Sequence, residues 1–208
     1  MKPIANWANV QAAKERDVLP AGGYVVKIVG AKVAEYPSFE RLEIALDIAE
    51  GDHKGFYEAD FKGQTQEDKK WKGVLRQYLP KDDGSQGDEW TKSSLKALIE
   101  AIEESNPGYH WDWDEAKLKG KTVGCLFRLE EWAYNGNKGW KAMPFKFIAA
   151  EKIRQGAFTE PKFKAHKDFP DDTPDNYQST EEATSGASST FAGGFQPVPA
   201  GEEELLPF

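Results

Sequence analysis

The sequence predicts a mainly β domain that carries a helical insertion and is followed by a disordered acidic tail. Three observations point to this class. Apolar and polar residues alternate between residues 21 and 61 and again from Lys121, apolar residues recur at helical spacings in between, and large apolar residues become rare after Phe169. Alternation with a period of two is typical of a strand with one buried face, whereas spacings of three and four residues indicate a helix.

Residues 1–20 are expected to form an N-terminal arm, and three strands are expected after it. The first strand covers 24–33 and the second 40–48, with a turn at Tyr36-Pro37-Ser38 between them. A third short strand is expected over 56–61. The second strand shows the cleanest alternation, and its buried set is predicted to be Leu42, Ile44, Leu46 and Ile48.

Residues 64–119 are predicted to be a helical insertion with two helices. The first helix is expected over 66–79 and ends before Pro80. Thr91 is expected to cap the second helix, and Asn106-Pro107-Gly108 to end it. The apolar residues at helical spacings are Trp71, Val74, Leu75, Tyr78 and Leu79 in the first helix and Leu95, Leu98, Ile99 and Ile102 in the second.

Two further strands are expected after the insertion, over 123–134 and 140–153, with Asn135–Gly139 as a five-residue hairpin loop. Three strands, a helical insertion and two strands is the order found in an OB-fold, a five-stranded and partly open barrel. We therefore expect residues 21–167 to form an OB-fold domain. A sheet with helices packed on one face is the alternative, because the spacing of the elements does not decide whether the barrel closes.

Charge is distributed unevenly along the 208 residues. Of the 35 acidic residues, nine lie between Asp168 and Phe208, a stretch without Lys or Arg, which leaves 26 acidic against 27 basic residues before it. Residues 168–208 also contain few large apolar side chains, so they bury too little surface to offset the entropy of ordering the chain. They are predicted to be a disordered linker that ends in an interaction tip.

The cysteine content and the hydropathy of the sequence indicate the cellular compartment. Cys125 is the only cysteine, which excludes a disulfide framework and a cysteine-based zinc site within one chain and fits a reducing compartment. The N-terminus lacks the apolar stretch of a secretory leader, and no run approaches the roughly 18 apolar residues of a membrane span. A cytoplasmic protein with no membrane partner is expected.

The last eight residues, 201–208, carry the most specific signal. A terminal Phe208 offers a ring for an apolar pocket and a carboxylate for a basic residue there, and the glutamates before it favour approach to a basic rim. Pro207 restricts the backbone and so lowers the cost of ordering it. The alternative is a tail that only improves solubility. The predicted partner-binding residues are Glu202, Glu203, Glu204, Leu205, Leu206, Pro207 and Phe208.

This ending resembles the acidic tip of bacterial single-stranded DNA-binding proteins, which close with acidic residues and a hydrophobic-Pro-Phe terminus. The order of body, Gly/Gln/Ser/Pro-rich linker and tip is also similar. The resemblance implies that Pro207 and Phe208 enter pockets on replication, recombination and repair proteins, while the body coats single-stranded DNA. Glutamates in place of aspartates, two leucines before Pro207 and the long insertion over 64–119 depart from the pattern. They suggest a divergent, phage-encoded version and leave a homo-oligomer open.

A body that coats DNA needs cationic side chains for phosphates beside exposed rings on which bases stack. Arg128, Trp132 and Tyr134 share one parity, and Trp140 and Lys146 are expected to extend their face. The candidate DNA-binding residues are Tyr36, Phe39, Arg41, Arg128, Trp132, Tyr134, Lys138, Trp140, Lys141 and Lys146. Core packing is the alternative for every aromatic residue, and it is the assignment made for Trp71, Phe127 and Phe147.

Enzyme signatures are incomplete. Residues 110–115 gather potential metal ligands without a second cluster elsewhere, and Gly120-Lys121-Thr122 lacks the upstream glycine of a P-loop, because residue 115 is Glu. We therefore expect no enzyme, metal or cofactor. Two hypotheses remain: a single-stranded DNA-binding protein, or an OB-fold adaptor or phage effector that binds protein or carbohydrate and whose tail mimics a host tip.

Overall fold

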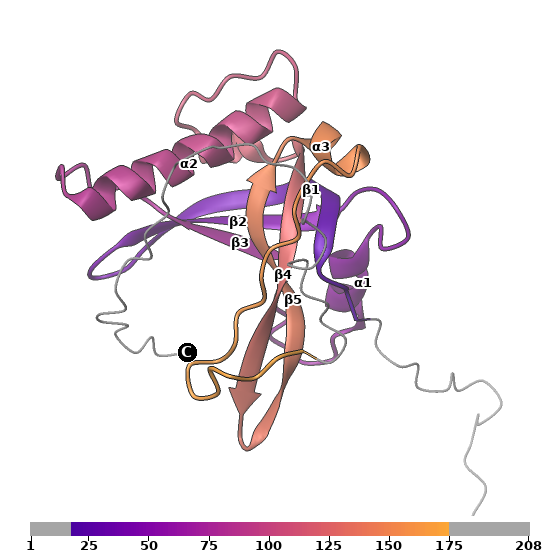
Figure 1. Cartoon of the computed structure of the whole chain (residues 1–208). Coiled ribbons are helices and arrows are strands. Elements are labelled where there is room, and N and C mark those ends of the chain that lie inside the picture. Colours follow the sequence, from indigo (N-terminus) through magenta and orange to yellow (C-terminus); the bar gives the residue numbers. More distant parts are fainter. Residues whose placement is uncertain (1–17, 175–208) are drawn as a thin grey trace, which may run out of the picture. The chain divides into compact units, whose positions relative to one another are not determined.

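The computed structural model describes residues 18–174, apart from the side chain of Gln86, and centres on one five-stranded antiparallel sheet (Figure 1). The strands are β1 (Gly22–Glu35), β2 (Glu40–Ile48), β3 (Val74–Tyr78), β4 (Thr122–Tyr134) and β5 (Asn137–Ile148), and their order in the sheet is β3-β2-β1-β4-β5. The helices are α1 (Phe56–Gly63), α2 (Gln86–Ser105), the short 3-10 helix η2 (Glu115–Leu118) and α3 (Ala150–Arg154). The predicted arm up to residue 17 and the predicted tip lie outside the described residues.

The first hairpin confirms the prediction from alternation. β2 has the predicted bounds, its alternate residues Leu42, Ile44 and Leu46 are buried, and a tight turn joins it to β1, with the Tyr36 N–H donating to the Phe39 carbonyl at 2.9 Å. Figure 1 shows that this hairpin and the β4–β5 hairpin project from the sheet in different directions.

The expected strand at 56–61 is wrong, because this segment is helix α1. The Asp47 carboxylate, at the end of β2, accepts hydrogen bonds from the Tyr57 and Glu58 backbone N–H groups at 2.9 and 3.2 Å. It thereby satisfies donors that a helix start leaves without partners, a contribution of about 1 kcal/mol. Tyr57 is buried with its ring stacked against Phe127, so a tertiary contact holds the helix in place.

The expected helix at 66–79 is also wrong, because the segment is a loop followed by strand β3. Leu75 is buried and pairs with Ile44 of β2, and the Leu46 N–H donates to the Gly73 carbonyl at 2.8 Å. Trp71 is half-buried against the core from the loop and donates its indole N–H to the Leu46 carbonyl at 3.0 Å. The helical spacing therefore arose from a loop residue and a strand that pack on the same core.

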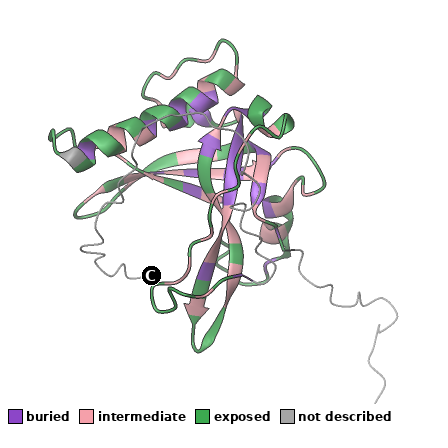
Figure 2. Ribbon diagram, in the orientation of Figure 1, coloured by how far each residue is buried: buried purple, intermediate pink, exposed green. Residues whose placement is uncertain are grey.

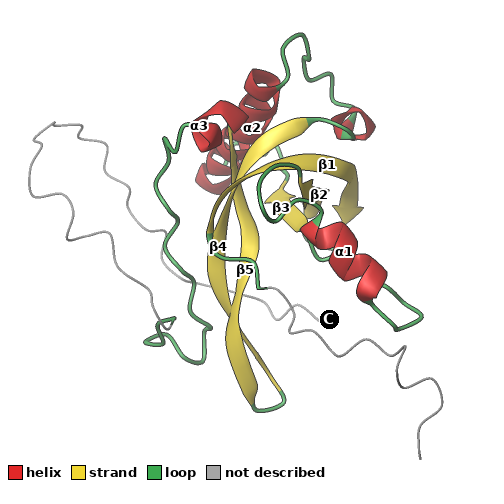
Figure 3. Ribbon diagram, turned by 90° about the vertical axis from the view of Figure 1, so that its right-hand side faces the viewer, coloured by secondary structure: helices red, strands yellow, loops and turns green. Residues whose placement is uncertain are grey.

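Helix α2 is the helix predicted from the second apolar stripe, but it begins earlier. Ser85, not Thr91, caps it by accepting a hydrogen bond from the Asp88 N–H at 3.2 Å. It ends at Ser105 as predicted, and the Asn106 side chain then exchanges hydrogen bonds with the backbone of Thr122 at 2.7 and 3.1 Å. The helix end is thus fixed to the start of β4 (Figure 3). The buried stripe of α2 includes Leu95, Leu98, Ile99 and Ile102.

The β4–β5 hairpin has a tighter turn than the predicted five-residue loop. Asn135 and Gly136 form a two-residue turn with φ values of 48° and 77°. Positive φ at both positions defines the turn type whose twist matches a hairpin, and Asn-Gly is its preferred sequence. β5 ends at Ile148, and α3 replaces the predicted continuation of the strand to residue 153.

Helix α3 lies directly on the sheet backbone at two glycines. A Cβ added to Gly23 of β1 or to Gly124 of β4 would lie 2.6 or 2.7 Å from the Ile153 side chain. At Gly124 the added Cβ would also lie 2.9 Å from the Ala149 and Ile148 carbonyl oxygens, so a larger side chain there would displace backbone, whereas at Gly23 it would displace the Ile153 and Phe158 side chains.

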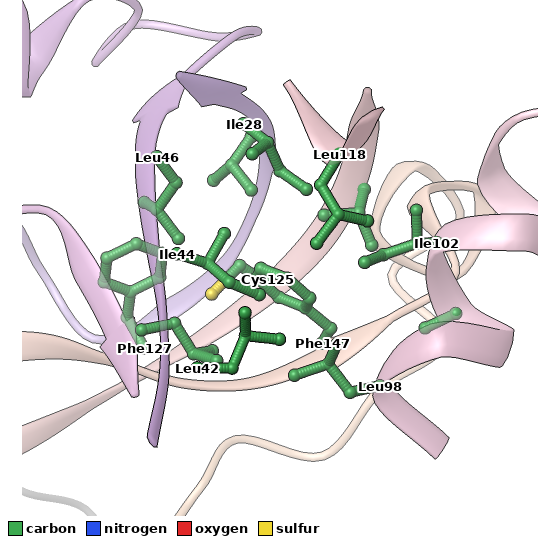
Figure 4. Close-up of a cluster of buried hydrophobic side chains, with 14 of the residues drawn as sticks. Ile28, Leu42, Ile44, Leu46, Leu98, Ile102, Leu118, Cys125, Phe127 and Phe147 are labelled. Atoms are coloured by element: carbon green, nitrogen blue, oxygen red, sulfur yellow. The ribbon is translucent and has the colours of Figure 1, made fainter. Parts of the chain in front are cut away.

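The core fills the inner side of the curved sheet beneath α2 (Figure 4), and the outer halves of the hairpins remain exposed (Figure 2). The sheet is not closed, because β3 and β5 form its two edges; their Cα atoms approach within 8 Å without a backbone ladder between them. The fold is therefore mainly antiparallel β with a few helices. The largest fully buried side chains are Val26, Ile28, Ile44, Leu46, Ile102, Leu118, Val123, Cys125 and Phe127.

Candidate nucleic-acid interface

The first candidate surface, here called the sheet surface, lies on the outer side of β1, β2 and β3. Register places Arg41 beside Tyr78 and Glu43 beside both Arg76 and Lys32, all on the side opposite the buried Leu42 and Ile44. The turn between β1 and β2 adds two aromatic residues. The sheet surface comprises Lys32, Tyr36, Phe39, Arg41, Glu43, Arg76 and Tyr78.

Three rings form a connected group on the sheet surface. Tyr36 stacks on Phe39 with ring centroids 4.6 Å apart and planes 24° apart, and Phe39 meets Tyr78 edge-on at 5.2 Å. Tyr36 and Tyr78 keep 38% and 46% of their surface exposed, so both offer faces to solvent. Such rings provide stacking positions that any base can use.

The charges of the sheet surface converge on one carboxylate. Glu43 lies 2.7 Å from Arg41, 3.6 Å from Lys32 and 3.7 Å from Arg76. Partial burial alone would raise the pKa of Glu43, but the hydrogen bond from Arg41 and the three neighbouring cations outweigh it and lower that pKa below its ordinary value. Arg41 also donates to the Tyr36 hydroxyl at 2.7 Å and lies over its ring.

The second candidate surface, here called the hairpin surface, is the outward face of β4 and β5. Register pairs Trp132 with Gly139, Glu130 with Lys141 and Leu126 with Lys146, and paired residues share a face. The Arg128 guanidinium lies 4.2 Å from the Phe145 ring centroid and donates to Glu130 at 2.8 and 2.9 Å. The hairpin surface comprises Arg128, Trp132, Tyr134, Lys141, Phe145 and Lys146, and its rings include the exposed Trp132, Tyr134 and Phe145.

The prediction that Trp132 and Trp140 share one face is wrong. Trp140 pairs with Glu131, and Lys138 with Ala133, so both lie on the opposite face of the hairpin. The two-residue turn starts β5 at Asn137 and so fixes this pairing. Trp140 meets the Phe163 ring edge-on at 5.5 Å and is only partly exposed.

Residues 161–174, here called the strap, cover that opposite face and the edge of β4. β1 begins at Gly22, opposite Phe127 of β4, and the strap pairs with β4 beyond that point. There the Lys164 N–H donates to the Leu129 carbonyl at 2.8 Å and the Glu131 N–H donates to the Lys164 carbonyl at 2.9 Å. The buried Glu131 carboxylate accepts from the His166 N–H at 3.0 Å. Residues 168–174, predicted to belong to the disordered linker, are therefore part of the folded body.

Lys138 is engaged by the strap. Its ammonium donates to the Asp172 carboxylate, lies 3.9 Å from Glu131 and sits 4.6 Å from the Phe169 ring centroid. The hydrogen bond with Asp172 raises the pKa of Lys138 and lowers the pKa of Asp172. Of the ten candidate DNA-binding residues, the structure thus places Lys138 and Trp140 against the strap and the other eight on the two outward surfaces.

Sequence reasoning missed five residues of these surfaces: Lys32, Glu43, Arg76, Tyr78 and Phe145. Arg76 and Tyr78 alternate with Leu75 and Gln77, a signal that was available but was overridden by the helical spacing of the same segment. Phe145 occupies a register shift opposite Leu126 and Phe127, so simple parity did not place it.

Other potential sites have structural explanations. Asp112 and Asp114 both bind Lys117. Within residues 18–174, no three His, Cys, Asp or Glu side chains gather as a metal site would require. Burial raises the pKa of the Cys125 thiol, which suits a core residue rather than a nucleophile. None of the helices in this range has both the length and the apolar character that crossing a membrane requires.

Comparison with protein-family models gave no match, and none of the curated proteins matches the sequence. The class of the site therefore has to be inferred from its geometry, which is two outward surfaces on which aromatic rings lie beside arginine and lysine.

Proposed function

We propose that the chain is a single-stranded DNA-binding protein with an OB-fold body. The observation that carries this proposal is the combination of exposed rings and cations on the sheet surface and the hairpin surface. Rings such as Tyr78 and Trp132 stack with bases, and the neighbouring cations attract phosphates. Neither interaction reads base edges, so binding is independent of sequence.

The strand arrangement supports the OB-fold part of the proposal. β1, β2 and β3 follow one another, β4 returns beside β1, α2 precedes β4, and β5 approaches β3 at the opening of the sheet. This strand order, with the two edge strands close together, is the one expected of a five-stranded, partly open barrel. In OB-folds, oligonucleotides bind the face of strands 2 and 3 and the loops between strands 1 and 2 and between strands 4 and 5. The sheet and hairpin surfaces occupy these same places.

The segment 175–208 supplies the second half of the proposal. Its final residues Glu202 to Phe208, outside the described residues, combine acidic and apolar groups, and they are proposed to recruit replication, recombination or repair proteins. The proposal implies that the protein acts in the cytoplasm of a bacterium or of a phage-infected cell.

A parallel titration tests the DNA-binding function. Intrinsic tryptophan fluorescence of the full chain is followed on addition of poly(dT), poly(A) RNA and duplex DNA at two salt concentrations. Saturable quenching by poly(dT), weaker with duplex and reduced by salt, supports the proposal. Absence of quenching by every nucleic acid contradicts it and favours the adaptor hypothesis.

Matched variants localise the binding. Tyr78→Ala removes an exposed ring of the sheet surface, and we expect it to weaken oligo(dT) binding by about 1–3 kcal/mol. Trp113→Ala removes a ring that is 79% exposed but lies in the acidic loop after α2, on neither surface, and we expect it to leave binding unchanged. Equal effects of the two variants would remove the sheet surface from the proposal.

A further inference from the structure

The centre of the sheet surface is a carboxylate, which is an unexpected group on a surface that binds a polyanion. Glu43 has a side chain that is only 16% exposed and is approached by three cations within 3.7 Å. Among residues 18–174, Glu43 is the one carboxylate that forms an ion pair with Lys32, Arg41 or Arg76. One carboxylate therefore forms ion pairs with three cations.

The three cations differ in how far they depend on Glu43. The Lys32 and Arg76 side chains are 72% and 46% exposed, so they reach solvent and can turn toward another anion. The Arg41 side chain is 12% exposed and is fixed between Glu43 and the Tyr36 hydroxyl. Glu43 thus holds Arg41 in a fixed position, whereas Lys32 and Arg76 remain available to bind a second anion.

We propose that Glu43 is an internal counter-ion that occupies the place of a DNA phosphate and limits how tightly the sheet surface holds single-stranded DNA. The inference rests on the proposed function and adds its regulation. In the free protein the carboxylate keeps the cations together; on binding, a phosphate takes over Lys32 and Arg76, and the nearby carboxylate repels it. Coulomb repulsion over several ångströms at a partly solvated site is large enough to matter for affinity.

The decisive substitution is Glu43→Gln. Glutamine keeps a side-chain oxygen that accepts the Arg41 hydrogen bond, and it removes the negative charge. We expect oligo(dT) to bind about three to thirty times more tightly at low salt, and the logarithmic salt slope to steepen by about 0.7, the value for one additional phosphate contact on a single strand. Glu43→Ala removes both the charge and the hydrogen-bond acceptor for Arg41, so we expect a smaller increase in oligo(dT) affinity.

Glu40→Gln is the matched control. Glu40 lies on the same strand, is exposed, points to the opposite face from Arg41 and forms no ion pair with any residue that the structure describes. It therefore reports the effect of one lost charge on the whole molecule. Affinities are measured by fluorescence anisotropy of labelled oligo(dT) on full-length proteins, and circular dichroism verifies that each variant is folded.

The outcomes separate this inference from the proposed function. Tighter binding and a steeper slope for Glu43→Gln than for Glu40→Gln support the counter-ion. An unchanged or weakened Glu43→Gln, with normal wild-type binding, overturns the counter-ion alone. Absence of binding by the wild type overturns both. If Glu43→Gln is unfolded, Glu43→Ala takes its place: binding tighter than that of Glu40→Gln supports the counter-ion, and unchanged or weaker binding overturns it.

Discussion

Two tryptophans of the β4–β5 hairpin differ in their exposure to solvent. Trp132 is exposed on the hairpin surface against Gly139, whereas Trp140 packs on Phe163 of the strap. Because stacking needs a free ring face, we expect Trp132→Ala to lose about 1–3 kcal/mol of oligo(dT) affinity and Trp140→Ala to lose little. Anisotropy titrations at one salt concentration measure both. Equal losses would mean that the strap leaves the hairpin when DNA binds.

The sequence predicted which residues are candidates for the surfaces better than it predicted the face of the sheet on which each one lies. The eight candidates that lie on the two surfaces were identified because aromatic and cationic residues occur together near turns, a local property of the sequence. Trp140 and Lys138 were misplaced because their face depends on the length of the turn at Asn135 and Gly136, which sets the pairing of every residue that follows. A shift of one residue in this register exchanges the two faces.

At the scale of elements, the strap depends on an ion pair whose pH response has a definite sign. The pKa of Asp172 is lowered from 3.8 and the pKa of Lys138 is raised from 10.5, mainly by their mutual hydrogen bond. The aspartate contributes its stabilisation above pH 3.8 and loses it as the pH falls through the lowered value. The lysine contributes below pH 10.5 and loses its share as the pH rises through the raised value.

Asp172→Asn should therefore loosen the strap at neutral pH, and the difference from wild type should vanish in acid. Hydrogen exchange of the Lys164 and Glu131 amides, which form the bridge between the strap and β4, measures this. Asp171→Asn is the control, because Asp171 is exposed and makes no ion pair within the described residues. A difference that persists at pH 2 would show that the effect is not electrostatic.

Elements with regular patterns were predictable, and those held by tertiary contacts were not. In β2 and in the buried stripe of α2, the spacing of the apolar residues alone predicts the type of element. Helix α1 forms where Asp47, ten residues before Tyr57 at the end of the preceding strand, caps it and where Tyr57 packs against Phe127, which is distant in sequence. β3 has only five residues, too few for alternation to outweigh the helical spacing that Trp71 contributes.

At the scale of the whole molecule, the uneven charge predicts competition between the tail and DNA. The segment after Pro174 holds six acidic residues and no Lys or Arg. We expect the chain ending at Pro174 to bind oligo(dT) more tightly than the full chain at low salt, with the difference shrinking as salt screens the charges. The boundary lies at 174 because the strap belongs to the body.

Deleting only Pro207 and Phe208 is the control for that experiment. This change leaves all six acidic residues in place, so DNA affinity should stay at the full-length value. Capture of replication and repair proteins should be lost, because the proposed anchors are gone. Equal or weaker DNA binding by the chain ending at Pro174 would argue against competition by the tail.

The two glycines beneath Ile153 would determine where a strand bound as proposed has to stop. Because α3 rests on the backbone of β1 and β4 at Gly23 and Gly124, the outer side of the sheet is blocked at that end, and Leu126 is already buried there. If the hairpin surface binds single-stranded DNA as proposed, α3 would block the strand at one end of this surface, and the other end, at the turn of the hairpin, would be open to solvent. We therefore expect contacts of oligo(dT) with the hairpin surface to end before α3.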